Sequence, residues 1–408
     1  MKVIIRIFII ILSANILYSQ GGSNYSIIGI GDINYDGNAA YSALSGTSAA
    51  FPSITAINFK NPALWSLVTT TRLQAGYKFS QHLNDKDNLS NFQNSGSING
   101  FSAIFAIDTS YGIAASIGVL PYSSINYLTA TKIQSEIDGS MINGSNTYQG
   151  KGGISMAYFG LSTKIIDNLS FGASAFASFG KVSTSRLTEY SDDPYLFKYT
   201  SSKDDFFSGL GFKGGLYYQP FKNFSLGYFL ESNDNLEIES KLIYSSPLIG
   251  DTTLISNSSY RIPLSQGFGI SYLSGVFIIG ADFSFQDYKD FNYNPGANSE
   301  FTNSWQFNIG VNRFGNESIN ASTLDKISYK FGFGTKKLYY TINGNDIMEY
   351  SFSMGASVPW SESFNSDISL NFGSRGSSGI GLIREYFAKL TIDLSIGEVW
   401  FIPFKREY

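Results

Sequence analysis

The sequence predicts an all-β protein, an antiparallel transmembrane β-barrel of about 14 strands located in the cell outer membrane. From residue 70 almost to the end of the chain, apolar and polar residues alternate with a period of two, which is the pattern of strands with two different faces. Tight turns alternate with longer polar connections, as in transmembrane barrels. The polar face is made of Ser, Gly and Asn, and only 15% of the 408 residues are charged, so this face suits a confined lumen better than a soluble surface.

The first 20 residues have the pattern of a secretory signal peptide. Lys2 and Arg6 precede an apolar stretch that extends to Leu17, and cleavage is expected near residue 20. The stretch is shorter than the roughly 20 apolar residues that a transmembrane helix needs. The sequence thus predicts three parts: a signal peptide (1–20), an N-terminal hatch, or plug (21–69), and the barrel (70–408).

The strands are expected where the alternation is regular, whereas residues 21–69 have no period and are rich in Gly, Ala, Ser and Asn. In the first strand, for example, Leu73, Ala75 and Tyr77 alternate with polar residues. The expected strands are 70–80, 99–107, 111–134, 149–165, 169–188, 203–219, 223–242, 260–273, 275–288, 301–313, 325–340, 347–359, 366–375 and 384–398.

The connections give the orientation of the barrel. Tight turns are expected at 167–168 and 274–275, among others, and an even strand number places both barrel ends on the periplasmic side. Two segments depart from the alternation of lengths: 314–324 is long and 341–346 is short. Long polar outer loops are expected at 81–98, 135–148, 189–202, 243–259 and 289–300.

Few residues could support catalysis or metal binding. The chain has no cysteine, which excludes disulfides, thiol nucleophiles and Cys-ligated metals. Its single histidine, His82, is expected in a solvated outer loop, where it would lack the rigid partners that an acid–base site needs. With a net charge of -4, nothing indicates a nucleic-acid partner. We therefore expect no enzyme activity, no cofactor and no metal site.

A short motif stands directly before the first strand: Asn61, Pro62, Ala63 and Leu64. A stretch of small residues, then this motif, then a strand resembles the FadL-type family of outer-membrane transporters for long-chain fatty acids. The PorV-type barrels of the type IX secretion system have a similar segment. The FadL resemblance implies a fourteen-stranded barrel with an N-terminal hatch folded inside it, and a hydrophobic cargo.

The third expected strand contains Pro121, which cannot donate a hydrogen bond to a neighbouring strand. The resemblance implies that this strand is kinked and opens a lateral window, with Tyr122 and Ile125 at its edge. The alternative is that the strand has already left the bilayer at Pro121, which then lies in an extracellular extension.

Several charged residues are predicted by their position in the alternation to point into the lumen. Either they form a structural network that holds the hatch, which we favour, or they guide a cargo. These residues are Arg72, Lys78, Lys213, Asp282 and Lys330, together with Lys389 and Asp393.

These observations lead to a functional hypothesis with one alternative. The chain is expected to be a monomer that passes small hydrophobic, fatty-acid-like molecules across the outer membrane, in contact with membrane lipids. The alternative is a structural or type IX secretion-associated barrel that binds an outer-membrane protein partner. Against the first hypothesis, the inward positions are more polar than a fatty-acid pocket would be; Phe176, Phe229 and Ile278 are exceptions.

Overall fold

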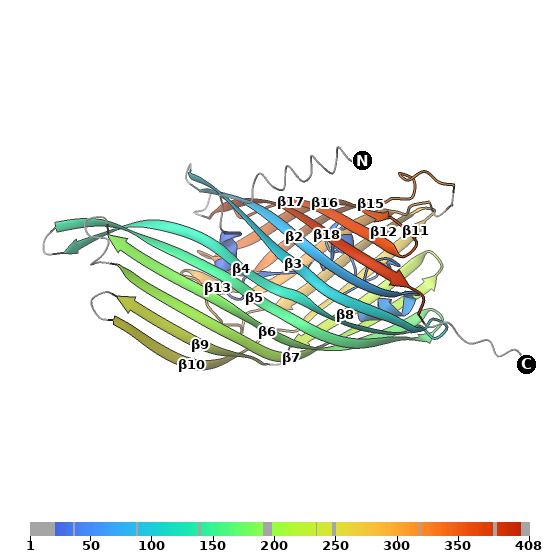
Figure 1. Ribbon diagram of the computed structural model, residues 1–408, viewed down its shortest axis with the longest axis horizontal. Coiled ribbons are helices and arrows are strands. Elements are labelled where there is room, and N and C mark those ends of the chain that lie inside the picture. The colour runs from blue at the N-terminus through green and yellow to red at the C-terminus, as the bar shows by residue number, and fades with distance from the viewer. Residues whose placement is uncertain are drawn as a thin grey trace, which may run out of the picture.

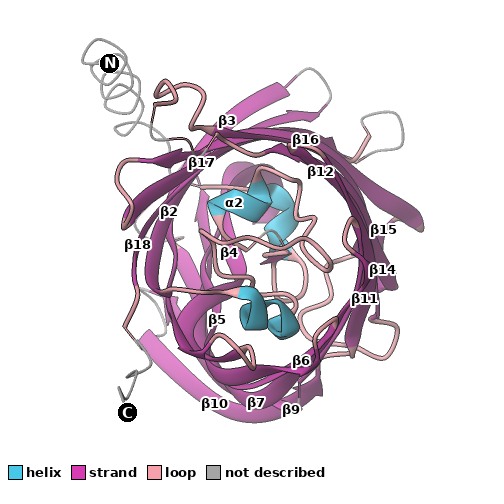
Figure 2. Cartoon of the chain, turned by 90° about the vertical axis from the view of Figure 1, so that its right-hand side faces the viewer, coloured by secondary structure: helices cyan, strands magenta, loops and turns pink. Residues whose placement is uncertain are grey.

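The wall of the protein is a closed antiparallel barrel of 14 strands (Figures 1 and 2), as the sequence predicts. The computed structural model describes residues 21–35, 37–86, 89–137, 140–190, 198–233, 235–246, 250–316, 318, 320–377 and 382–400. The predicted signal peptide therefore lies outside the described residues. The wall strands are β2 (Thr71–Lys86), β3 (Leu89–Asp108), β4 (Ile113–Ile137), β5 (Ser140–Ile166), β6 (Leu169–Tyr190), β7 (Tyr199–Phe221), β8 (Phe224–Asn233), β11 (Ser265–Ser274), β12 (Phe277–Asp287), β14 (Asn303–Arg313), β15 (Ser328–Ile342), β16 (Asn345–Pro359), β17 (Phe364–Arg375) and β18 (Arg384–Glu398).

The first and last wall strands close the barrel. β18 pairs with β2 along its whole length, from Arg384 opposite Asp85 to Glu398 opposite Thr71. This closure pairs the backbone groups of the first and last wall strands, which would each cost several kcal/mol if left unpaired in the hydrocarbon region of a bilayer.

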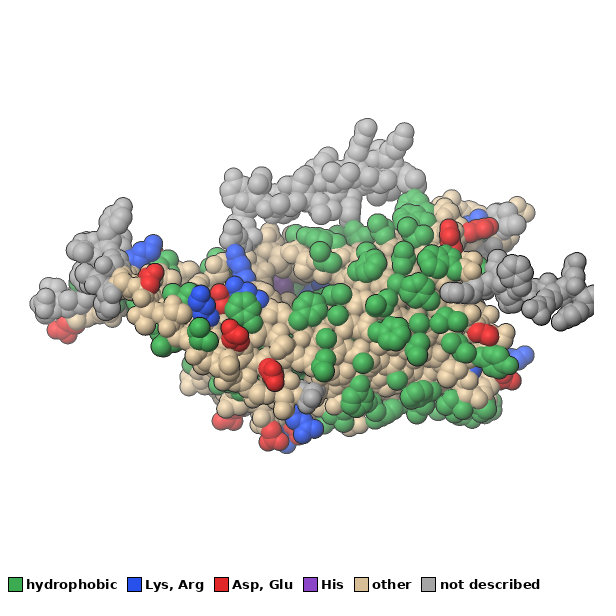
Figure 3. Space-filling view, turned by 60° about the horizontal axis from the view of Figure 1, so that its bottom comes forward, with side chains coloured by type: hydrophobic (Ala, Val, Ile, Leu, Met, Phe, Trp, Pro, Cys, Tyr) green, Lys and Arg blue, Asp and Glu red, His purple; other side chains and the backbone are tan. Residues whose placement is uncertain are grey.

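Apolar side chains cover the outside of this barrel. On β6, Phe171 and Phe179 are exposed, whereas Ser170, Ser174 and Ser178 on the opposite face are buried. Figure 3 shows that apolar side chains gather over the barrel and are sparse on the extension at one end. Such a belt around a closed wall is the surface of a transmembrane barrel. Among the described residues, no helix is long and apolar enough to span a membrane.

The strands extend further at the outer end than the alternation predicts. β2 and β3 leave only residues 87 and 88 between them, and β4 and β5 only 138 and 139, so the long loops expected at 81–98 and 135–148 are mostly strand. These segments are Ser- and Asn-rich on both faces, because both faces meet water there, and the period of two is lost. The short connection near 343 is a hairpin turn, where Asn343 (φ 52) and Gly344 (φ 72) adopt the left-handed conformation.

One hairpin does not belong to the wall. The strand expected at 223–242 is two strands, β8 and β9 (Asn235–Ser246), and the loop expected at 243–259 contains β10 (Gly250–Arg261). β8 pairs directly with β11 in the wall, whereas β9 pairs with the outer half of β7, and β10 pairs with β9. The β9–β10 hairpin thus widens the sheet beyond the barrel mouth (Figure 1). A further short strand, β13 (Ser299–Phe301), pairs with β15.

The described residues of the N-terminal segment, 21–35 and 37–69, lie inside the ring of strands (Figure 2). Their elements are η1 (Asn24–Ile27), β1 (Asp32–Ile33), α2 (Ala39–Ser42) and η2 (Pro62–Leu67). Glycines on the inner face of the wall make room for them: a Cβ on Gly172 would overlap Pro62, and one on Gly215 would overlap Asn61. Backbone and wall therefore approach more closely than any other residue type would allow.

Candidate functional site: the seam between β3 and β4

The wall is incompletely paired between β3 and β4. Their pairing runs from Asp108 opposite Ile113 only as far as Phe101 opposite Val119. Beyond this point the outer half of β3 pairs with β2 alone, and the outer half of β4 pairs with β5. Figure 1 shows the outer ends of β2 and β3 separating from those of β4 and β5. We call this interruption the seam.

Pro121 lies where the seam opens. The register between β4 and β5 shifts between Pro121 and Ser123, so Tyr122 is an extra residue in β4. A bulge of this kind bends a strand and re-aims its side chains. On β3, Gly100 lies one residue beyond the last paired position, Phe101, and has a φ of +113, a conformation that other residues rarely adopt.

Part of the N-terminal segment occupies the seam; we call residues 23–35 the seam segment. On the β4 side, Asp32 and Ile33 of β1 pair with Ser124 and Ser123 in an antiparallel register. The Asn34 backbone N–H continues this pairing by donating to the Tyr122 carbonyl oxygen at 2.8 Å. The short strand β1 thus takes the place beside β4 that β3 has left.

The seam segment also contacts the β2–β3 side. Lys78 Nζ on β2 donates to Asn34 Oδ1 at 3.0 Å, and Gln93 Nε2 on β3 donates to Asn24 Oδ1 at 3.4 Å. The same Gln93 amide donates across the seam to the Leu128 carbonyl oxygen of β4 at 2.8 Å. The outer part of the seam is therefore bridged by side chains and by the seam segment.

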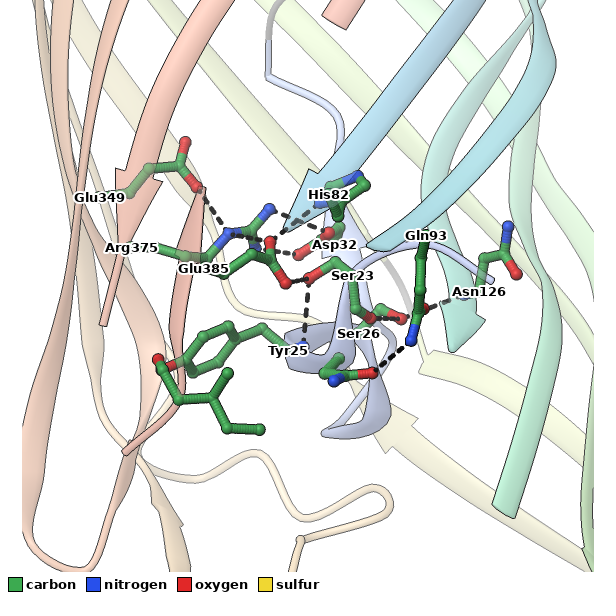
Figure 4. Close-up of polar contacts among 12 residues, drawn as sticks. Ser23, Tyr25, Ser26, Asp32, His82, Gln93, Asn126, Glu349, Arg375 and Glu385 are labelled. Carbon is green, nitrogen blue, oxygen red and sulfur yellow. Dashed lines mark hydrogen bonds and ion pairs between the residues drawn. The ribbon is translucent and has the colours of Figure 1, made fainter. Parts of the chain in front are cut away.

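An ionic cluster around the buried Arg375 side chain fixes the seam segment to β17 and β18 (Figure 4). Arg375 on β17, whose side chain is 1% exposed, binds Asp32 with two nitrogens, at 2.7 and 3.3 Å. Its Nε lies 3.0 Å from Glu385 Oε1 and 3.4 Å from Glu349 Oε2. Glu385 in turn accepts a hydrogen bond from Ser23 Oγ at 2.9 Å. Both ends of the seam segment are thereby tied to one guanidinium.

The charge state of Asp32 follows from this geometry. Burial alone would raise the pKa of its carboxyl group, but the paired Arg375 guanidinium holds that pKa below its usual range. Asp32 is therefore ionised at neutral pH, and its two-pronged pairing with the buried guanidinium is strong and directional.

Two cavities meet at the seam segment. The outer one has a volume of about 600 Å³, and its wall includes Ile125, Lys78 and His82. The inner one has a volume of about 80 Å³ and is lined by Pro121 and Tyr122, among others. Residues Ile33–Tyr35 line both cavities, so this short stretch separates them. Beyond the inner cavity lies a small apolar pocket lined by Phe59, Trp65, Leu120, Met156, Tyr158 and Phe176, with Ser174 and Lys213.

The motif before the first strand lies against the first residues of β6 and the last residues of β7. Asn61 Nδ2 donates to the Leu216 carbonyl oxygen at 3.0 Å, and its Oδ1 accepts from Ala63 N at 3.0 Å. Pro62 occupies the first position of η2, where a missing N–H costs nothing. Leu64 is 3% exposed. These residues lie far along the chain from the seam segment and anchor the other end of the N-terminal segment.

Of the seven charged residues predicted to point into the lumen, five make the following contacts with interior groups. Arg72 donates to Ser395 Oγ at 3.2 Å, and Lys213 pairs with Glu231 at 2.8 Å. Asp282 accepts from the backbone of Ser48 at 2.6 Å and of Ala49 at 2.8 Å. Lys330 pairs with Asp367 at 3.2 Å, and Lys78 contacts Asn34 as above. Lys78 belongs to the seam, Lys213 lines the inner cavity, and Asp282 holds the N-terminal segment.

The expectation for His82 was wrong. It lies on β2, not in a solvated loop, is 4% exposed, and its Nδ1 is 3.0 Å from Glu385 Oε1. The even-numbered residues Ser80 and Asn84 flank it on the buried face, so extending the alternation of the first strand to 85 would have placed it inside. Arg375 and Glu349 were likewise missed, because their partners are distant in sequence. Among the described residues, no group of three His, Asp or Glu side chains could hold a metal ion.

A family model and several solved structures match the chain. The model described as BamG matches residues 1–407. The chain belongs to the BamG family. A search of curated proteins finds no match. The barrel, with its apolar belt, belongs to the outer membrane.

The similar solved structures are outer-membrane-type barrels of the FadL kind. The CymD monoaromatic hydrocarbon channel is 15% identical, with a TM-score of 0.59 over 92% of this chain and 99% of that one. The Ralstonia pickettii toluene transporter TbuX is 15% identical, with a TM-score of 0.61 over 89% and 99%. A FadL homologue of Pseudomonas aeruginosa is 10% identical, with a TM-score of 0.61 over 90% and 99%. At these identities the similarity shows that this member of the BamG family shares the FadL-type fold.

Proposed function

We propose that this BamG-family barrel passes small hydrophobic molecules through its interior and releases them sideways at the seam. The observation that carries the proposal is the end of β3–β4 pairing at Phe101 and Val119, at the place where two cavities meet. In this proposal Pro121, Tyr122 and Ile125 form the edge of the lateral opening, and Ile33–Tyr35 must move for a molecule to pass between the cavities.

The similar structures support a hydrophobic cargo. One is titled a monoaromatic hydrocarbon channel and another a toluene transporter. The small pocket beyond the inner cavity supports a hydrophobic cargo because its lining is mostly apolar and aromatic. At about 10 Å³ it has room for no more than a water-sized group, so even a single aromatic ring would have to displace part of this lining. A fatty acid would have to displace more of the N-terminal segment.

Uptake by cells tests the proposal. The chain is produced in the outer membrane of a Gram-negative host that lacks its own hydrocarbon channel, and uptake of radiolabelled toluene and of a radiolabelled long-chain fatty acid is measured. Toluene uptake above that of a host carrying an unrelated barrel is the expected result. Uptake of neither compound, with the barrel correctly inserted, would contradict the proposal.

The second candidate is a barrel that binds a protein partner and transports nothing. It is favoured by the polar lining of the larger cavity, which includes Lys78, His82, Glu349 and Lys389, and by the buried ion pairs that hold the N-terminal segment inside. Absence of uptake, together with co-purification of a stable outer-membrane complex, is what this candidate predicts.

A further inference from the structure

The outermost strand of the extension, β10, has one edge that pairs with no strand in the registers of the described residues. Its other edge pairs with β9 from Gly250 opposite Ser246 to Arg261 opposite Asn235. β10 is exposed on both faces for most of its length, and Figure 1 shows it at the margin of the sheet, away from the barrel. Its free edge therefore presents a row of backbone N–H and C=O groups to water.

This edge lacks the usual protections against strand pairing. Exposed edges are commonly blunted by Lys, Pro, inward charges or bulges. The eight residues Thr252–Ser259 contain no charge and no proline, and their pairing with β9 has no register shift. The neighbouring strand β9, which is covered on both sides, carries Glu237, Glu239 and Lys241 instead. The charged residues thus lie on β9, which is paired on both sides, and are absent from the centre of β10, which has the free edge.

Two apolar side chains on β10 add to this surface. Leu254 is 55% exposed and Ile255 is 67% exposed, and as consecutive strand residues they lie on opposite faces of the sheet. The charges of β10 stand at its two ends, at Asp251 and Arg261. We propose that β10 is a docking site for an extended segment of another polypeptide, which adds to the sheet as one more strand.

The chemistry of the occupant follows from this edge. Main-chain hydrogen bonds would supply most of the affinity, and an uncharged, β-branched centre of about eight residues would match Thr252–Ser259. An antiparallel occupant would carry an acidic residue at its N-terminal end, opposite Arg261, and a basic one at its C-terminal end, opposite Asp251. This inference does not depend on the proposed transport function.

A second copy of the chain is a poor occupant for a geometric reason. The β9–β10 hairpin continues the barrel wall beyond the barrel mouth (Figure 1), and the wall of a transmembrane barrel stands roughly along the membrane normal. An antiparallel β10–β10 pair has its two-fold axis perpendicular to the sheet, and hence in the membrane plane. Such an axis would invert one barrel relative to the other, whereas two copies in one membrane must share a direction.

Two synthetic peptides test the proposal on the full-length protein in detergent. Each has a Thr-, Val- and Ser-based centre; one carries Glu first and Lys last, and the other carries the same residues with the two charges exchanged. Peptide binding is measured by fluorescence anisotropy, and hydrogen exchange of β10 is followed by mass spectrometry. The expected result is binding of one peptide, with slowed exchange confined to β10 and with I255K abolishing both effects.

The control variant is E239K, because Glu239 lies in the same hairpin but between two paired strands, opposite Phe206 and Asn257. It changes the charge of the hairpin and leaves the free edge intact, so binding should persist. Binding of neither peptide, or equal binding by wild type and I255K, would overturn the proposal. The proposal would also be overturned if, without peptide, hydrogen exchange of β10 became slower as the protein concentration increased. That result would favour a second copy of the chain as the occupant.

Discussion

The two sides of the β2–β3 hairpin join the rest of the wall in different ways. On one side β2 pairs with β18 over the entire length of β18, from Thr71 to Asp85 of β2. On the other side β3 pairs with β4 only near the periplasmic end, and the seam segment occupies the remainder. The β2–β18 contact is a continuous ladder of main-chain hydrogen bonds. The seam between β3 and β4 is instead filled by a short segment that side chains hold in place. A closed barrel can thus contain a place where the wall could open without breaking the pairing between two wall strands.

Local sequence explains part of this difference. On β18, Leu390, Ile392 and Leu394 alternate with polar residues without interruption. On β4, Pro121 lacks an N–H and adjoins the bulge at Tyr122, and on β3 Gly100 adopts a positive φ. The β3–β4 pairing ends next to these three residues.

The largest expected effect on the difference between the two sides of the hairpin comes from replacing Arg375. In the Arg375→Met variant the buried Glu349 and Glu385 and the partly exposed Asp32 lose their shared cation, and we expect the attachment of the seam segment to weaken by about 3–5 kcal/mol. Hydrogen exchange of residues 23–35 should accelerate strongly, with little change at β18–β2. Lys198→Met is the matched control, because Lys198 and its partner Glu189 are 49% and 39% exposed. Equal exchange in both variants would argue against the ionic attachment.

A smaller effect is expected at the other end of the N-terminal segment. In Gly215→Val the added side chain would overlap Asn61, and the displacement should cost about 1–3 kcal/mol of thermal stability. In the control Gly214→Val the new Cβ would meet only Leu230, at 3.6 Å, on the outer face. Thermal unfolding followed by circular dichroism compares the two. Exchange at residues 23–35 should not change in either variant, and if it does, the two ends of the segment are coupled.

The smallest effect on stability is expected from Pro121→Val. Valine restores an N–H and favours a regular strand, so the change in unfolding free energy should stay within about 1 kcal/mol. If the seam is a lateral exit, a straighter β4 should still reduce uptake of toluene. Normal toluene uptake by a correctly folded variant would show that the bulge is not needed for the proposed lateral route.

The sequence predicts the wall well and the site only in part. Alternation identifies the strands and the inward direction of Arg72 and Asp282, because one face of each strand meets lipid. It fails in the extension, where β10 and the outer half of β5 have water on both faces and no reason to alternate. It fails also for the ionic cluster, since Arg375 and Asp32 are separated by 343 positions and nothing local relates them.

The proposed role of the seam segment is tested most directly by a disulfide that locks it in place. The chain has no cysteine, and Ile33 and Ser123 lie opposite each other in paired strands, so Ile33→Cys with Ser123→Cys introduces one defined bridge. A bridge between the wall residues Leu226 and Ile270, which also lie opposite each other, is the control. Toluene uptake should be lost in the oxidised seam variant, return on reduction, and stay unchanged in the control. Uptake that is equal in the oxidised and reduced seam variants would contradict the claim that the seam segment must move.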